Sequence, residues 1–167
     1  MNLVQIGDDI DGVHNYDHAG CEVSISDNGQ RVAVGSKGGD PPGKADAGIV
    51  RVYDVSGPGG AKVWTQVGQD IEGEALLDLS GYSVALSADG NRVAIGAHEN
   101  DKGTGLEYVE YGHVRVYELV GNTWTQMGAD IDAPLEGDDA KAALALLPVL
   151  AATLLLSVAL RAAAALV

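Results

Sequence analysis

The sequence has no phenylalanine, a single cysteine and few basic residues. Cys21 has no partner within the chain, which excludes an intrachain disulfide, and we expect it to be a small buried residue in a strand. All 24 Asp and Glu residues stand before Lys141, but only eight of the ten Lys and Arg do, so the first 140 residues are strongly acidic. Such a surface repels phosphates, which argues against nucleic acid as a partner. Cations, basic surfaces and neutral glycans remain as candidate ligands.

The clearest local pattern is GYSVALSADGNRVAIGA at residues 81–97, where two runs of alternating apolar residues flank Asp89 and Gly90. Asp-Gly between two such runs predicts a β-hairpin, because Gly accepts the positive φ that a tight turn needs. The same pattern occurs at residues 20–35, at a constant offset of 61. Residues 48–53 match 112–117 at an offset of 64, and 64–68 match 124–128 at 60. The chain therefore contains an internal repeat of about sixty residues.

Each repeat is expected to form four strands, because short β-rich runs alternate with Gly-rich connections. The expected strands are 21–26, 31–35, 49–54 and 63–67 in the first copy, and 82–87, 92–96, 113–118 and 123–127 in the second. Residues 3–7 resemble a lone fourth strand. A four-stranded unit at this period is typical of a β-propeller blade. The predicted fold is all-β, with tandem four-stranded antiparallel blades over residues 1–139 forming an incomplete β-propeller.

The repeat resembles a known family. GYSVALS, RVAIGA and GHVRVYEL follow one another as the strands do in the FG-GAP repeat of integrin-α-type propellers. Ser80-Gly81 stands at the Phe-Gly pair, and His98 follows Gly96-Ala97 where the family has Pro. The resemblance covers about residues 3–133, with two complete repeats and an interrupted third. It implies a non-enzymatic adhesion or recognition module, displayed at the cell surface, that binds a protein or glycan ligand.

That family often carries a calcium loop between its first two strands. Here the equivalent turns are only residues 27–30 and 88–91, too short to supply six to eight oxygen ligands. We therefore expect no cofactor at these turns. A second metal hypothesis concerns His14 and His18, which flank Asp17. No helix places these residues on one face, so their spacing alone does not define a metal site.

From residue 140 to residue 167 the composition changes to Ala, Leu and Val, and 19 uncharged residues separate Lys141 from Arg161. As a helix, this stretch would span about 28 Å, which suits a bilayer core. We therefore expect a single-pass membrane anchor, with Ala142, Leu150 and Leu160 in the apolar helix. Two alternatives are a lipid-anchor signal and a truncated or misassembled end, since the change falls inside a repeat.

Residues that recur at matching places in both repeats are expected to serve the blade itself. They are Trp64 and Trp124, Arg31 and Arg92, Arg51 and Arg115, and Tyr53 and Tyr117. The arginine side chains are expected to pair with neighbouring carboxylates. Function is expected where the copies differ, in loops on a rigid scaffold. The longest such loop, residues 98–111, offers carboxylates beside aromatic side chains, which suit a sugar or a basic peptide; the alternative is a solvated acidic loop that binds no ligand. The candidate ligand-binding residues are His98, Glu99, Asp101, Glu107, Tyr108 and Tyr111.

No nucleophile elbow, phosphate loop or zinc-protease motif occurs in the sequence. Two alternatives to a recognition module remain. One is part of a propeller glycan hydrolase, which would use a pair of the abundant carboxylates. The other is a truncated gene product without independent function. Two repeats are too few to close a propeller, so self-association to complete the ring is also expected.

Overall fold

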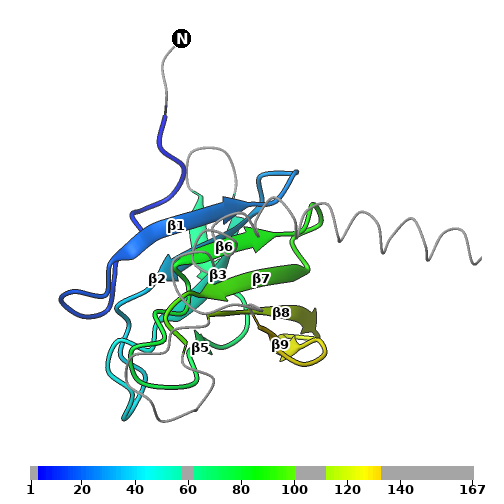
Figure 1. Ribbon diagram of the computed structural model, residues 1–167. Coiled ribbons are helices and arrows are strands. Elements are labelled where there is room, and N and C mark those ends of the chain that lie inside the picture. The colour runs from blue at the N-terminus through cyan, green and yellow to red at the C-terminus, as the bar shows by residue number, and fades with distance from the viewer. Residues whose placement is uncertain (1–3, 58–61, 101–111, 133–167) are drawn as a thin grey trace, which may run out of the picture.

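The computed structural model describes residues 4–57, 62–100 and 112–132 (Figure 1). In this part of the chain the regular structure is entirely β-strand. The first sheet contains β1 (Ala19–Ile25), β2 (Arg31–Ser36), β3 (Ile49–Ser56), β4 (Val63–Gln66) and β5 (Ile71–Glu72). The second sheet contains β6 (Ser83–Leu86), β7 (Arg92–Ala97), β8 (His113–Val120), β9 (Thr123–Gln126) and β10 (Ile131–Asp132).

Both sheets are antiparallel and have the same strand order. In the first sheet β1, β2 and β3 are neighbours, and β4 and β5 both pair with β3. In the second sheet β9 and β10 pair with β8 in the same way. The outer strand of each sheet is thus divided into two short pieces. Gly68 and Gly128, both at positive φ, lie in the breaks.

The register is also repeated from one sheet to the other. Corresponding Cα pairs are Val23 with Val34 and Val84 with Ile95, Arg31 with Asp54 and Arg92 with Glu118, and Val50 with Ile71 and Val114 with Ile131. The eight strands expected from the sequence are all present, within two residues at each end. The two-residue strands β5 and β10 were not expected, because their apolar runs are too short to alternate.

The hairpin between β6 and β7 confirms the expected role of Gly90, which has a φ of 71°. Asp89 accepts hydrogen bonds from the Ser87 hydroxyl at 2.6 Å and from the Asn91 amide at 3.0 Å. These hydrogen bonds, that of the hydroxyl first, hold the pKa of Asp89 below its ordinary value. The oxygens of this short turn therefore stabilise the turn itself.

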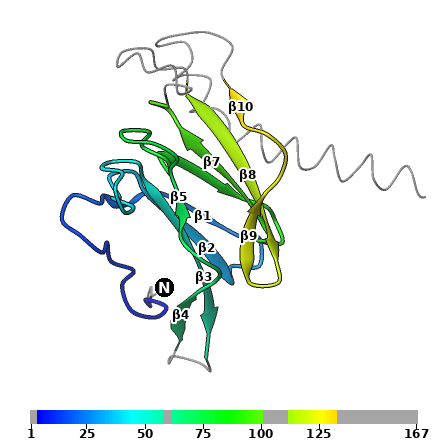
Figure 2. The same cartoon turned by 90° about the horizontal axis from the view of Figure 1, so that it is seen from below.

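The hydrophobic core lies between the two sheets, whose outer parts diverge in Figure 2. Ala33, Val50, Val52 and Ile71 come from the first sheet, and Val84, Leu86, Val93, Ile95 and Trp124 from the second. The Trp124 side chain reaches across to the first sheet, where its Nε1 donates to the Val67 carbonyl at 2.9 Å. Trp64 makes the equivalent hydrogen bond to the Ile6 carbonyl at 3.1 Å. Both tryptophans thus have the structural role expected from their repetition.

Three features differ from expectation or lie beyond the described residues. Residues 4–7 form no strand, because no described segment supplies a partner strand for them. Cys21 is exposed, although a buried cysteine was expected, because it lies where the pairing of β1 with β2 is irregular, between Ala19 and Glu22. The expected C-terminal helix over residues 140–167, with Ala142, Leu150 and Leu160, lies outside the described residues. Within the described ranges, no helix is long and apolar enough to cross a bilayer.

Candidate functional site

The connections between strands lie at two opposite edges of the sheets. The turn edge carries the short hairpin turns at residues 26–31 and 87–92. The loop edge carries the longer connections at residues 36–49 and 72–83, and the ends of β7 at Ala97 and of β8 at His113. The charged groups of both edges are candidates for binding, because binding groups concentrate in loops that a rigid scaffold holds in place.

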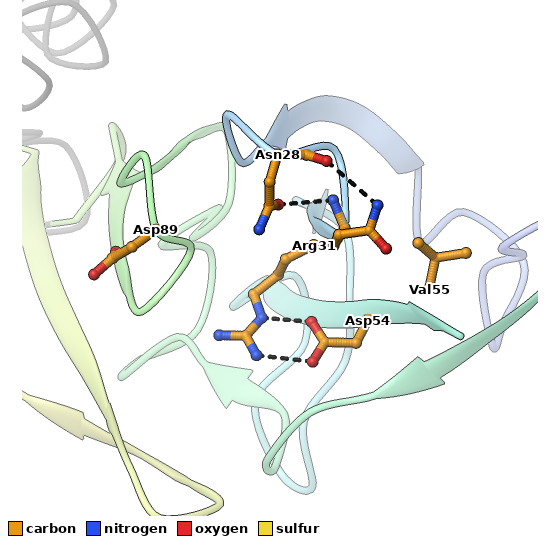
Figure 3. Close-up of a pocket in the computed structure, with 6 residues that line it drawn as sticks. Asn28, Arg31, Asp54, Val55 and Asp89 are labelled. Atoms are coloured by element: carbon orange, nitrogen blue, oxygen red, sulfur yellow. Dashed lines mark hydrogen bonds and ion pairs between the residues drawn. The ribbon is translucent and has the colours of Figure 1, made fainter. Parts of the chain in front are cut away.

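The turn edge has a hollow of about 210 Å³ beside Arg31, shown in Figure 3. The Arg31 guanidinium donates to both oxygens of Asp54, at 2.6 and 2.8 Å. It also donates to the Gly90 carbonyl at 2.9 Å and to Asn91 Oδ1 at 3.1 Å, both in the other sheet. The hydrogen bond with Asp54 raises the pKa of Arg31 further above neutrality. Because Arg31 pairs with Asp54 and is hydrogen-bonded to the turn of the other sheet, we assign it to the contact between the sheets.

Two of the candidate ligand-binding residues lie in the described part of the loop edge. His98 Nε2 lies 3.3 Å from Glu99 Oε1, and the His98 ring packs on Tyr82 with 3.9 Å between the ring centroids. Lys37 Nζ lies over the Tyr82 ring, 5.3 Å from its centroid. The remaining candidates, Asp101, Glu107, Tyr108 and Tyr111, lie outside the described residues. His98 and Glu99 are therefore brought together with an aromatic ring at the junction of the two sheets.

A second group of polar side chains lies nearby and was not expected from the sequence. It consists of Glu74 in the loop before β6, His113 and Arg115 on β8, and Asp130 just before β10. The Arg115 guanidinium contacts the Glu74 carboxylate and donates from Nε to Asp130 Oδ1 at 3.0 Å. His113 Nδ1 lies 3.9 Å from Asp130 Oδ2. We call these four residues the loop-edge cluster.

Burial and charge have opposite effects in the loop-edge cluster. The His113 residue is only 3% exposed, and burial lowers the pKa of its imidazole although Asp130, Asp78 and Asp132 favour the charged form. Burial also raises the pKa of Asp130, but hydrogen bonds from Gln126 and Arg115 outweigh it and hold this pKa below its ordinary value. Burial thus favours the neutral form of the His113 imidazole, and the hydrogen bonds favour the ionised form of Asp130.

The loop-edge cluster is specific to the second sheet. At the positions of Glu74 and His113, the first repeat has Val13 and Ile49. Only the pair of Arg115 and Asp130 is repeated, as Arg51 and Asp70, with 2.7 Å between Nη2 and Oδ2. A signal for the cluster was present in the sequence, because two apolar positions of one repeat are polar in the other. The prediction from the longest loop, residues 98–111, did not include these two positions.

The cluster also has the donor types of a metal site. One ligand atom from each of Glu74, His113 and Asp130 lies within 4.8 Å of the other two. However, Arg115 already places a positive charge against both carboxylates. A metal ion in this position would have to displace the guanidinium and overcome its repulsion. The donor set therefore fits an internal ion-pair network better than a resident metal ion.

A comparison with known proteins adds no family to this geometry: no protein-family model and no curated protein matches the sequence.

His113 predicts a pH dependence of stability. Its folded-state pKa is lowered, so its contribution is fully present above the unfolded pKa, near 6.5, and is lost as the pH falls through the folded value. We expect His113→Ile, which installs the residue found at Ile49, to reduce the loss of stability between pH 7 and pH 5. Urea unfolding at several pH values measures this slope.

The matched control for His113 is His14→Gln, since His14 is exposed. We expect this variant to keep the slope of the unaltered protein. An unchanged slope in His113→Ile would show that His113 does not titrate differently in the folded and unfolded states.

Proposed function

We propose that the two sheets are successive blades of a β-propeller of the FG-GAP, integrin-α type, and that the chain is a non-enzymatic recognition module. Support comes from the common strand order and register of two sheets about sixty residues apart. A core shared between their faces also supports it, because propeller blades bury their faces against one another. The extended loops of such a scaffold would present the binding residues.

The ligand that we propose is a basic segment of a protein, bound at the loop edge. The observation that carries this proposal is the replacement of two apolar positions by Glu74 and His113 at this edge of the second sheet. The Glu74 side chain is 49% exposed, and that of nearby Glu72 is 43% exposed. Glu74 also contacts Arg115, and Glu72 Oε2 lies 3.6 Å from Lys44 Nζ, so a basic ligand would share these carboxylates with cations of the chain. Because a carboxylate has two oxygens and several lone pairs, the exposed part of each one can accept a further hydrogen bond from a cationic ligand at the loop edge.

The full chain tests this proposal in a fluorescence anisotropy titration with a labelled octapeptide of alternating Lys and Arg. We expect saturable binding that weakens with salt, because the contacts are ionic. The double variant Glu72→Gln/Glu74→Gln should bind at least several-fold more weakly. Asp27→Asn/Glu118→Gln removes the same charge at the turn edge and should bind normally. Equal loss in both double variants would indicate unspecific attraction, and binding of a neutral oligosaccharide instead would favour a glycan ligand.

We also propose that residues 142–160 tether the module to a membrane, with the blades at the cell surface. The support is the sequence itself, which has 19 uncharged residues between Lys141 and Arg161. Flotation of the full chain with phosphatidylcholine vesicles tests the tether. Leu150→Arg/Leu154→Arg should abolish flotation, because each charge in a bilayer core is costly. Flotation that is the same in both proteins, or absent from the unaltered chain, would contradict it.

A further inference from the structure

A five-residue motif, Gln-x-Gly-x-Asp, occurs three times in the chain, at residues 5–9, 66–70 and 126–130. In each copy the Gln side chain donates to the Gly carbonyl and to the Asp Oδ1. The distances to Oδ1 are 2.8 Å from Gln5, 2.8 Å from Gln66 and 2.7 Å from Gln126. Three copies therefore share one local conformation, although only two complete sheets are described.

The aspartate of two copies is paired with an arginine from the third strand of its own sheet. Arg51 on β3 binds Asp70, and Arg115 on β8 binds Asp130. Asp9 has the same conformation and is exposed, but each of the four arginines in the described ranges pairs with another carboxylate. The first copy of the motif thus presents a carboxylate in the orientation that receives an arginine elsewhere.

The first copy is also seated on the first sheet as the second copy is seated on the second sheet. Trp64 donates to the Ile6 carbonyl beside Gly7, as Trp124 donates to the Val67 carbonyl beside Gly68. A Cβ added at Gly7 or Gly68 would contact the ring of the respective tryptophan. Residues 5–9, in the dark blue segment before β1 in Figure 1, therefore occupy the place of the outer strand of a preceding sheet.

The face of β1 beside this segment is apolar and uncovered. Val23 and Ile25 are 57% and 60% exposed. Their counterparts in the second repeat, Val84 and Leu86, are only 2% and 9% exposed because the first sheet covers them. The first sheet thus has an uncovered surface that corresponds to a fully packed one. We call it the open face, defined by Val23, Ile25 and Asp9.

We propose that the open face binds a partner polypeptide in the form of a three-stranded antiparallel sheet, whose third strand brings an arginine to Asp9. The first three strands of a repeat form such a sheet, and the third of them carries an arginine, Arg51 on β3 or Arg115 on β8. They would cover Val23 and Ile25 as β1 to β3 cover Val84 and Leu86. This inference rests on the geometry of the two described sheets and not on the ligand of the loop edge.

A complete second copy of the chain fits the open face less well. Its second sheet carries its own outer segment, residues 126–130, with Asp130 already bound to Arg115. That segment would compete with residues 5–9 for the same place on Trp64. A sheet that lacks its fourth strand avoids this overlap, and its arginine is unpaired before docking. Asp9 offers an exposed carboxylate to an arginine, and residues 5–9 already occupy the place of an outer strand on Trp64. Both features favour a partner sheet of three strands over one of four.

The probe is a fluorescein-labelled synthetic peptide of residues 81–120, which contains β6, β7, β8 and Arg115 but no outer strand. Anisotropy titration with the full chain should give saturable binding. Asp9→Asn in the chain should weaken it about tenfold or more, since a charge-assisted hydrogen-bonded pair is lost. Arg115→Gln in the peptide should weaken it similarly, and combining both changes should add little. In the full chain, Val23→Asp/Ile25→Asp should abolish binding of the peptide. The control substitution in the full chain is Val120→Asp, at a residue of β8 that is 59% exposed, and it should leave binding unchanged.

Three results would overturn the proposal. The peptide does not bind, it binds equally well to Val23→Asp/Ile25→Asp, or the effects of Asp9→Asn and Arg115→Gln are fully additive. Sedimentation velocity of the full chain tests the competing occupant. A concentration-dependent dimer that Val23→Asp/Ile25→Asp disrupts would assign the open face to a second copy instead. Circular dichroism melting of each chain variant confirms that these exposed substitutions leave the protein folded.

Discussion

Trp124→Ala is expected to lower the free energy of unfolding by about 3–5 kcal/mol, the usual effect of truncating a buried tryptophan. Trp124 is 3% exposed and belongs to the core cluster between the two sheets. Its ring packs beside Gly68, and its Nε1 donates to the Val67 carbonyl. The substitution therefore opens a cavity and leaves a carbonyl without its donor at the contact that joins the sheets. Equilibrium unfolding in urea measures the change.

The matched control is Trp64→Ala, which removes the same side chain from the equivalent position of the first sheet. Trp64 is only partly buried and packs beside Gly7 on a segment without a strand partner. We expect a loss of about 1–2 kcal/mol, in the ordinary range for partly buried sites. If the two variants lost equal stability, the contact between the sheets would not be the principal packing of Trp124.

The second large effect is expected for Gly48→Ala, which should cost about 3 kcal/mol or more, through overpacking against backbone added to strain at positive φ. Gly48 precedes β3 with a φ of 85°. A Cβ at this position would collide with the backbone carbonyl of Ser80, in the loop that leads to the second sheet. Backbone cannot rotate away as a side chain does. Thermal and urea unfolding should both register the loss.

Gly43→Ala separates the two causes. Gly43 has a φ of 79°, but no atom lies within 4 Å of the place that its Cβ would occupy. This variant should show only the cost of positive φ, about 1 kcal/mol. Similar losses in the two alanine variants would mean that the loop of Ser80 moves aside, and that the close approach of the two loops contributes little to stability.

The sheets could be predicted from the sequence because their determinants are local. Alternating apolar residues and the Asn28-Gly29 and Asp89-Gly90 turns defined the strands and hairpins, and the repeat defined their order. The divided outer strands were missed, since Ile71–Glu72 is held by pairing with β3 and by the break at Gly68. The absence of a strand at residues 4–7 has the same origin. Strand formation there depends on a partner, which the local pattern does not reveal.

The candidate site was harder to predict because its residues are distant in sequence. His98 and Glu99 were found as loop residues, and the structure brings them beside Tyr82. Glu74 and Asp130 lie 56 positions apart in the sequence, and both contact Arg115. Arg115 was correctly expected to pair with a carboxylate, but its additional contact with Glu74 depends on how the two sheets pack. Comparison of the repeats position by position would have identified Glu74 and His113.

The matching register of the two sheets has a consequence for folding. Because β2 and β7 offer equivalent pairing patterns, β2 could accept β8 in place of β3, within one chain or between two chains. Neighbouring repeats of similar sequence are prone to such exchange. Within one chain, pairing β2 with β8 closes a loop roughly six times longer than pairing β2 with β3, which costs about 1.6 kcal/mol of additional chain entropy. The connection between β2 and β3 therefore favours the native pairing kinetically, before the core between the sheets has formed.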